Sequence, residues 1–362
     1  MRRIFVLIAV ALSACLVHAQ DAENVGNSAQ LSIIPRVDLN PYVGFRSDAG
    51  TDFSLSNSSL YTLLEGNFGE HLSYSIMNHW LSAEPASLYQ DTFFHSDVTN
   101  WCDWANLTLS FGDFAFTFGK CAMALGLWEQ DAYDYESHFD LNSTMWNEMQ
   151  VYQWGGDVSM TFADQYTATL QLTSSPFTER PFEAGVFSGG FMLRKDEGDF
   201  NFLASLNLIG TQGLSGDWQS GFEPDRSTRF IKMPCLGVKY AFGDFVAGVD
   251  WSYRNEERYY VNEMGTCATL EYSPSDKLDF LLKGGYESCY PISYRGSISG
   301  NKKVNAPLYS VDGRFYGGLA AHYYPLRDND ALRLHGVIAY DNGFQGLSIN
   351  IGALYNITLN IK

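Results

Sequence analysis

After its first 20 residues, the sequence has no long apolar run and few basic side chains. No stretch of about 18 apolar residues occurs there, which excludes membrane-spanning helices. The 23 Lys and Arg residues face 41 Asp and Glu residues, a formal net charge of −18. Because phosphate binding needs a Lys/Arg-rich surface, this balance argues against nucleic acid as a partner.

Cysteine is also sparse, and no C-x-x-C pair is present. An odd number of cysteines, scattered over the chain beyond the N-terminal apolar run, is not the pattern of a disulfide framework. The missing C-x-x-C pair argues against a structural zinc site, so we predict no metal and no cofactor. A cross-strand disulfide between Cys102 and Cys121 stays open as an alternative.

The N-terminus has the three parts of a secretory signal. Arg2 and Arg3 precede an apolar run from 4 to 16, and Val17-His18-Ala19 follows, with the cleavage site placed after Ala19. We predict a signal peptide over 1–19 and a short N-terminal periplasmic segment over 20–36. Alternatively, the box ending at Cys15 marks a lipoprotein, with Cys15 lipidated at the new N-terminus.

Alternation with period two dominates the rest of the chain, as in strands with one apolar and one polar face. The apolar set of the last segment is Ile349, Ile351, Ala353, Tyr355, Ile357, Leu359 and Ile361. Segments of this kind, joined by Gly-Asp turns such as 112–113 and 243–244, predict sixteen strands. Their predicted ranges are 37–47, 58–68, 72–82, 102–111, 114–125, 147–162, 166–175, 185–195, 200–211, 230–242, 245–256, 262–273, 278–290, 312–324, 331–341 and 346–361.

Most of these strands are longer than the five or six residues usual in soluble proteins, and short turns largely alternate with long loops. Both features are typical of outer-membrane barrels. We therefore predict an all-β fold over 37–362, a transmembrane antiparallel β-barrel of about 16 strands with short periplasmic turns and long extracellular loops. Because lipid cannot hydrogen-bond a free strand edge, the first and last strands should pair.

A barrel of this size is too wide for side chains to fill, so it encloses water. The pattern predicts a porin in the outer membrane of a Gram-negative cell, through which small hydrophilic solutes or ions diffuse passively. By alternation, charges of both signs face inward and line the pore. They are Arg194, Lys239, Asp250, Arg254, Glu271, Asp279, Lys283, Glu287, Arg314 and Arg333, accompanied by His322 and His335.

The third long loop, about 126–148, is rich in aromatic and acidic residues. An aromatic loop favours contact with other residues over free water, so we predict that it folds into the barrel and narrows the channel. The alternative is a surface loop that shields the pore mouth. The residues chosen for the constriction are Trp128, Glu129, Asp131, Asp134, Glu136 and Asp140.

Lys120 conflicts with the alternation of its own strand. Strict period two from Phe114, Phe116 and Phe118 points Lys120 at lipid, at a cost of about 2–4 kcal/mol near the midplane. We therefore predict a bulge or register shift at Gly119 that turns Lys120 into the pore.

The stretch F-A-F-T-F-G-K-C-A-M-A-L-G-L-W-E, residues 114–129, resembles the segment before the constriction loop of the phosphate-selective porin O and P family. The resemblance implies a 16-stranded channel that is typically a homotrimer, with its third loop folded inside. The expected partners are then the lipid bilayer, permeating solutes or ions, and two further copies of the chain.

Two other functions stay open from sequence alone. A binding or structural barrel would use its aromatic loops to hold glycans. An outer-membrane hydrolase would need a nucleophile and a nearby base, and neither G-x-S-x-G nor H-E-x-x-H occurs. We predict that the chain is not an enzyme.

Overall fold

The computed structural model describes residues 27–361, apart from several gaps. Those gaps are 45–50, 56, 83–101, 134, 144, 147–148, 150, 177–184, 218–220, 257–260, 292–312, 327–330 and 343–345. The predicted signal peptide, Cys15 and Asp134 lie outside the described residues. None of the helices within the described part is long and apolar enough to cross a membrane.

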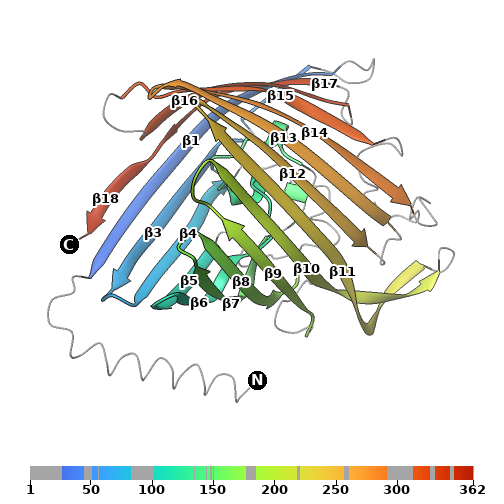
Figure 1. Cartoon of the computed structure of the whole chain (residues 1–362). Coiled ribbons are helices and arrows are strands. Elements are labelled where there is room, and N and C mark those ends of the chain that lie inside the picture. The colour runs from blue at the N-terminus through green and yellow to red at the C-terminus, as the bar shows by residue number, and fades with distance from the viewer. Residues whose placement is uncertain are drawn as a thin grey trace.

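Strands make up almost all of the regular structure (Figure 1). Two short 3₁₀ helices, η1 (Glu129–Asp131) and η2 (Phe139–Leu141), follow the strand that ends at Ala122 and precede the strand that begins at Tyr152. The strands are β1 (Ser28–Gly44), β2 (Thr51–Ser54), β3 (Ser59–Phe68), β4 (Leu72–Ser82), β5 (Cys102–Phe111), β6 (Phe114–Ala122), β7 (Tyr152–Phe162), β8 (Tyr166–Ser174), β9 (Phe187–Lys195), β10 (Phe200–Asp217), β11 (Gly221–Phe242), β12 (Phe245–Glu256), β13 (Val261–Ser275), β14 (Leu278–Pro291), β15 (Arg314–Tyr323), β16 (Leu332–Asp341), β17 (Gly346–Tyr355) and β18 (Ile357–Ile361).

The strands form one closed antiparallel ring. Neighbouring long strands in the chain pair with each other, and β1 closes the ring by pairing with β3 on one side and with β17 and β18 on the other. β17 and β18 continue each other across Asn356, and β2 is a short addition at the end of β1. The described residues thus form a barrel of sixteen strands, and the predicted pairing of first and last strands is confirmed.

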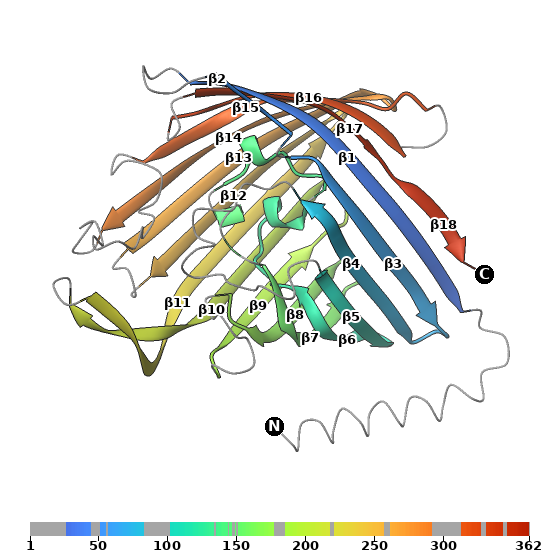
Figure 2. The same cartoon turned by 180° about the vertical axis from the view of Figure 1, so that it is seen from behind.

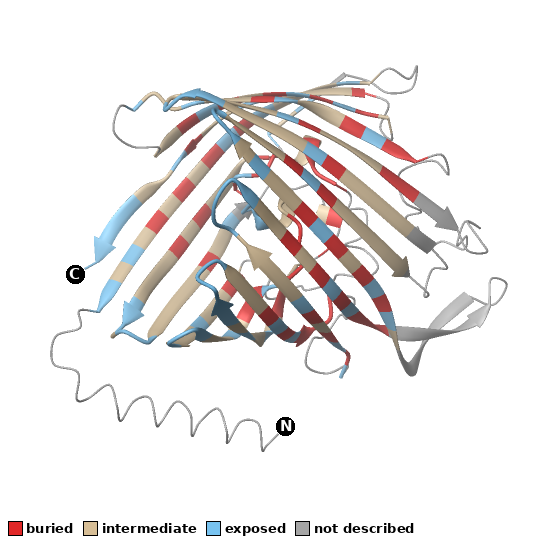
Figure 3. Cartoon of the chain, in the orientation of Figure 1, coloured by how far each residue is buried: buried red, intermediate tan, exposed pale blue. Residues whose placement is uncertain are grey.

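Exposed residues alternate with buried or half-buried ones along the strands (Figure 3). In β8, Leu170 is 66% exposed and Leu172 is 63% exposed, whereas Gln171 between them is 6% exposed. Large apolar side chains such as Phe191, Leu206 and Ile338 are exposed on other strands in the same way. An apolar outer skin of this extent favours lipid over water as its surroundings.

Aromatic rings stack from strand to strand at the end of the barrel that carries the short turns. Phe245 stacks on Phe242 at 5.5 Å and on Tyr272 at 4.5 Å between ring centroids, and Tyr272 continues to Phe280. Phe162 and Tyr166 stack across another short turn. Such a belt is typical of the level where a membrane barrel meets the lipid headgroups.

The first strand differs from the prediction. β1 begins at Ser28, so much of the predicted non-strand segment 20–36 belongs to the sheet, with Ala29 paired with Ile361. The inner face of β1 carries Ile34 beside polar Ser32 and Arg36, which blurred the apolar–polar alternation at this end. β10 and β11 also extend well beyond the predicted ends. The prediction missed these extensions because the added residues are mainly polar or Gly and show no apolar alternation.

The structure corrects the local prediction at Gly119. β6 pairs with β5 and β7 without a register shift, but Gly119 has a φ of 129°, and a Cβ there would lie 2.1 Å from the carbonyl oxygen of Ala105. The positive φ, which glycine adopts readily, thus occurs without an inserted residue. Lys120 is buried, and its ammonium donates to the carbonyl of Cys102. Cys102 and Cys121 are free thiols, so they do not form the disulfide left open above.

Candidate functional site

The segment 123–149, called the inner loop below, packs against inward-facing side chains of the barrel. Figures 1 and 2 show its short helices in the space that the strands enclose. Three apolar clusters join it to the wall. The first combines Met123, Leu125, Leu127, Met145 and Met149 with Ile209, Ile231, Met233 and Cys235; the second joins Tyr135 to Tyr61, Trp104, Tyr152 and Leu354, among others; and the third joins Leu141 to Ala320, Val337 and Ala339.

Asp250 of β12 holds the start of η1. Its two carboxylate oxygens accept hydrogen bonds from the backbone N–H groups of Trp128, at 3.0 Å, and Glu129, at 2.8 Å. The first N–H groups of a helix have no partner within it, so an acidic side chain is a favourable acceptor there. Asp250 therefore fixes where the inner loop meets β12.

Glu129 and Lys283 form a buried ion pair between η1 and β14. Lys283 Nζ lies 2.8 Å from Glu129 Oε1 and donates to Asn142 Oδ1 at 3.1 Å. The same Glu129 oxygen accepts from the backbone N–H of Ser143 at 2.8 Å. One lysine of the wall thus binds two separate points of the inner loop.

Arg194 of β9 binds the other end of η1. Its two terminal nitrogens donate to the two carboxylate oxygens of Asp131 at 2.8 and 2.9 Å, a bidentate geometry, and its Nε contacts Asp196. The Trp128 ring lies near both Arg194 and Lys239, with the ammonium of Lys239 4.9 Å from the ring centroid. Lys239 also lies 3.8 Å from Glu271.

Arg314 of β15 completes the polar contacts on the opposite wall. It pairs with Glu287 at 3.0 Å and with Asp341 at 2.6 Å, and it donates to the carbonyl of Asn142 in the inner loop. Arg254 pairs with Glu263 of the neighbouring strand.

Burial changes the ionisation of the inner loop. It raises the pKa of Asp140 to about 6, opposed by a hydrogen bond from Ser348. It lowers the pKa of His138 well below the usual 6.5, and the neighbouring His322 acts in the same direction. Burial also raises the pKa of Tyr133 and Tyr135. At neutral pH, His138 is therefore neutral.

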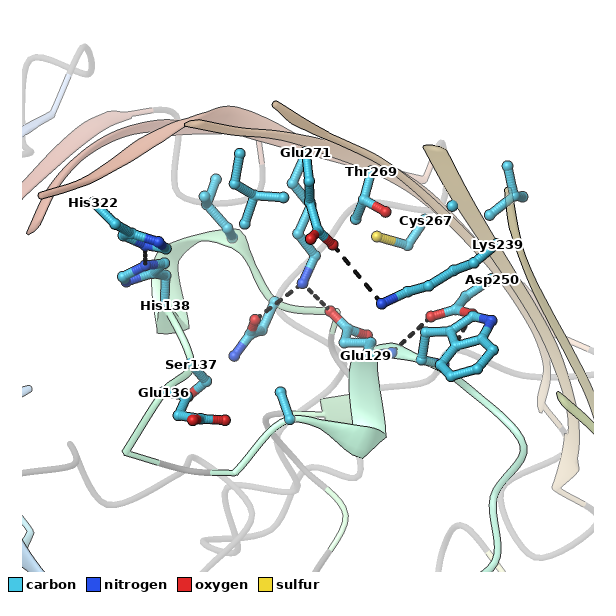
Figure 4. A pocket seen from close by; sticks show the side chains of 18 residues that line it. Glu129, Glu136, Ser137, His138, Lys239, Asp250, Cys267, Thr269, Glu271 and His322 are labelled. Atoms are coloured by element: carbon cyan, nitrogen blue, oxygen red, sulfur yellow. Dashed lines mark hydrogen bonds and ion pairs between the residues drawn. The ribbon is translucent and has the colours of Figure 1, made fainter. Parts of the chain in front are cut away.

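A cavity of about 170 Å³ lies between the inner loop and β11–β15 (Figure 4). Its lining combines carboxylates and ammonium groups with the face of one indole. Glu271 and Lys239 point toward each other from the wall, while Glu129 approaches from the loop. The charged and aromatic members include Trp128, Glu129, Lys239, Asp250, Glu271 and Lys283.

Most of the predicted charges of loop and wall come together in this region. Glu129 pairs with Lys283 and Asp131 with Arg194, both of them predicted wall residues. Glu136 is exposed and lines the cavity, whereas Lys120 is bonded within the wall. Whether these residues line a permeation path stays a prediction. Sequence reasoning missed Arg36, because it placed the start of the barrel at 37. It also missed Asp38, which lies inside the predicted strand 37–47 but was not chosen as an inward-facing charge. The signal was the alternation of Ile34, Arg36 and Asp38 on one face.

No potential metal site made of three or more His, Cys, Asp or Glu side chains occurs among the described residues. The chain matches no protein-family model and no curated protein. The fold itself defines the class: a closed antiparallel β-barrel of sixteen strands, of the porin type.

Similar solved structures cover nearly the whole chain. An anion-selective porin from Comamonas acidovorans has a TM-score of 0.60 at 9% identity, covering 92% of this chain and 100% of its own. OmpT of Vibrio cholerae has a TM-score of 0.58 at 10% identity, covering 93% and 99%. A mutant Rh. blastica porin has a TM-score of 0.56 at 12% identity, covering 91% and 100%. At these identities the likeness establishes the fold alone.

The prediction that the chain is not an enzyme needs correction. Several of the similar structures are of OmpT, an outer-membrane protein of Vibrio cholerae, at 10–13% identity. These neighbours weaken the inference from missing catalytic motifs, because one barrel fold accommodates different activities. The prediction is therefore withdrawn.

Proposed function

We propose that the protein is an outer-membrane channel for passive diffusion of small hydrophilic solutes or ions. The observation that carries this proposal is the pairing of a closed sixteen-stranded wall with a polar inner face, on which ionic contacts hold the inner loop. Barrels of 16–18 strands leave an aqueous bore. The cavity beside the inner loop supports a path that the loop leaves partly open.

The inner loop is the proposed constriction. Its apolar residues pack against the wall, and its carboxylates divide into two groups. Glu129 is buried in an ion pair, whereas Asp131 keeps 40% of its side chain exposed and Glu136 is exposed. The narrowest part of the channel would then present carboxylates to passing water.

We further propose a modest preference for cations. In two ion pairs beside the inner loop, the acid is the more exposed partner: Asp131 at 40% against 28% for Arg194, and Glu271 at 44% against 28% for Lys239. Lys283 and Arg314 are buried. Because exposed charges dominate the field in the water of a pore, cations should be favoured.

Three finer points belong to the same proposal. Residence in the outer membrane agrees with the apolar outer face. The signal peptide over 1–19 would export the chain toward that membrane. A homotrimer is supported by one similar structure, an OmpT in a trimer form. Kinship with the phosphate-selective porin O and P family rests on the resemblance of residues 114–129.

Planar-bilayer conductance under a potassium chloride gradient tests the channel and its preference together. We expect discrete current steps. We also expect a reversal potential whose sign shows that potassium permeates more readily than chloride. The double variant Asp131→Asn with Glu271→Gln should move that potential toward the anion side, whereas Lys232→Gln, on the exposed face of β11, should leave it unchanged. Purified, folded protein that passes no current would refute the channel.

A further inference from the structure

Two arginines of the wall lie on one row of the inner face. Arg36 of β1 is the register partner of Leu354 in β17, and Leu354 is in turn the partner of Arg333 in β16. Directly paired residues of antiparallel strands share a face, so both guanidinium groups extend from the side on which Leu354 contacts Tyr135 of the inner loop. Arg36 is 2% exposed and Arg333 is 8% exposed.

The next inward-facing row contains an acid and two imidazoles. Asp38 accepts from Arg36 Nε at 2.7 Å and lies 2.9 Å from His335 Nε2. Gly352 of β17 lies between Asp38 of β1 and His335 of β16 in this row. A Cβ at Gly352 would lie 2.0 Å from the Asp38 carboxylate, so glycine leaves room for the contact between Asp38 and His335. His138 of the inner loop covers the row, with its Nε2 2.8 Å from that of His322.

The two arginines have more hydrogen-bond donors than acceptors around them. Arg36 uses Nη1 for the carbonyls of Tyr135 and Ser137, which fixes the inner loop to β1. Among the residues that the structure describes, its Nη2 has no hydrogen-bond partner, and neither have Nε and Nη2 of Arg333. Three buried guanidinium nitrogens are thus unsatisfied, although buried donors in folded proteins are nearly always bonded.

Nearby carboxylates do not satisfy these donors. Asp38 is engaged by Arg36 and His335. Asp140 is hydrogen-bonded to Ser348, and the side chain of Glu136 is exposed. Within the described part of the chain, Asp38 is thus the carboxylate that pairs with Arg36, and Arg333 takes part in no ion pair, so a second negative charge would satisfy the remaining donors.

We propose that a small monovalent anion, the size of chloride, binds between Arg36 and Arg333 and fastens the inner loop to the β1–β16 wall. It accepts hydrogen bonds from the three free guanidinium nitrogens. It also holds Arg36 in the orientation that binds the two loop carbonyls. A tetrahedral dianion would need more donors than the site offers. This anion is a fixed part of the fold and is separate from ions that pass through a channel.

Bromide is the probe for this site, because it replaces chloride and can be located by anomalous X-ray scattering. Crystals of the whole protein, grown without chloride and soaked in sodium bromide, should show a peak within about 3.5 Å of nitrogens of both arginines. The peak should vanish in Arg333→Gln and persist in Lys232→Gln. A site that holds only water, or peaks confined to exposed basic side chains (an adventitious ion only), would overturn the proposal.

Thermal unfolding provides a measurement in solution. At equal ionic strength, bromide should raise the melting temperature above that in gluconate, which is too large for the site. Arg333→Gln should abolish the difference. Equal melting temperatures of the wild-type protein in both salts would contradict the anion site. Neither experiment measures current, so the anion site and the channel succeed or fail separately.

Discussion

Replacing Lys283 with methionine removes the buried cation that binds two points of the inner loop. The Glu129 carboxylate then keeps the Ser143 N–H as its described donor. At 2.8 Å and an effective dielectric constant of about 20, the attraction in this pair is about 6 kcal/mol before desolvation. Because desolvation cancels part of that attraction, losing one partner of a buried pair costs about 3–5 kcal/mol.

Urea unfolding of the protein in lipid vesicles, followed by tryptophan fluorescence, measures this loss. Lys283→Met should lower the free energy of unfolding by about 3–5 kcal/mol and increase current noise as the loop is released. The double variant with Glu129→Gln should lose less than the two single variants together, since it leaves no unpaired buried charge. Lys277→Met, in the turn before β14, is the matched control. Additive losses, or a Lys283→Met protein as stable as the wild type, would refute the reasoning.

Three further predictions use the same unfolding assay. Gly352→Ala should cost about 1–3 kcal/mol because its Cβ collides with Asp38, while Gly336→Ala, with nothing within 4 Å, should cost less; equal costs would contradict the close packing. Leu170→Arg on the outer face should lower the free energy of unfolding in bilayers by about 2–4 kcal/mol, and Leu170→Val by less than about 1.5 kcal/mol. An arginine variant as stable as the wild type would argue against lipid contact at this position. Burial raises the pKa of Asp140 from 3.8 to about 6, so its ionisation opposes folding above pH 6 by about 3 kcal/mol, and this penalty disappears as the pH falls from about 6 to about 4. Asp140→Asn should remove that part of the pH profile, and an unchanged profile would show that Asp140 is not its source.

The barrel could be predicted because its physical requirement is local and repeated. Each strand that crosses lipid must turn apolar side chains outward and polar ones inward, so the alternation from Ile349 to Ile361 is written in the sequence itself. Closure follows from the hydrogen-bonding needs of the strand edges, and β1 indeed pairs with β17 and β18. The same reasoning failed at Ser28 and at Gly119, where polar composition or one glycine torsion replaced the regular pattern.

The amino-acid sequence alone determined the strand class, the approximate strand number and the alternation of apolar with polar side chains, because all three depend on neighbours a few residues away. The partners of those charges were decided by the tertiary structure. Glu129 meets Lys283 across 154 positions, and Arg36 meets the carbonyl of Ser137 across 101. Such contacts depend on ring closure and on the path of the inner loop. No local period records either one, so only the closed barrel brings Arg36, Arg333 and the inner loop together.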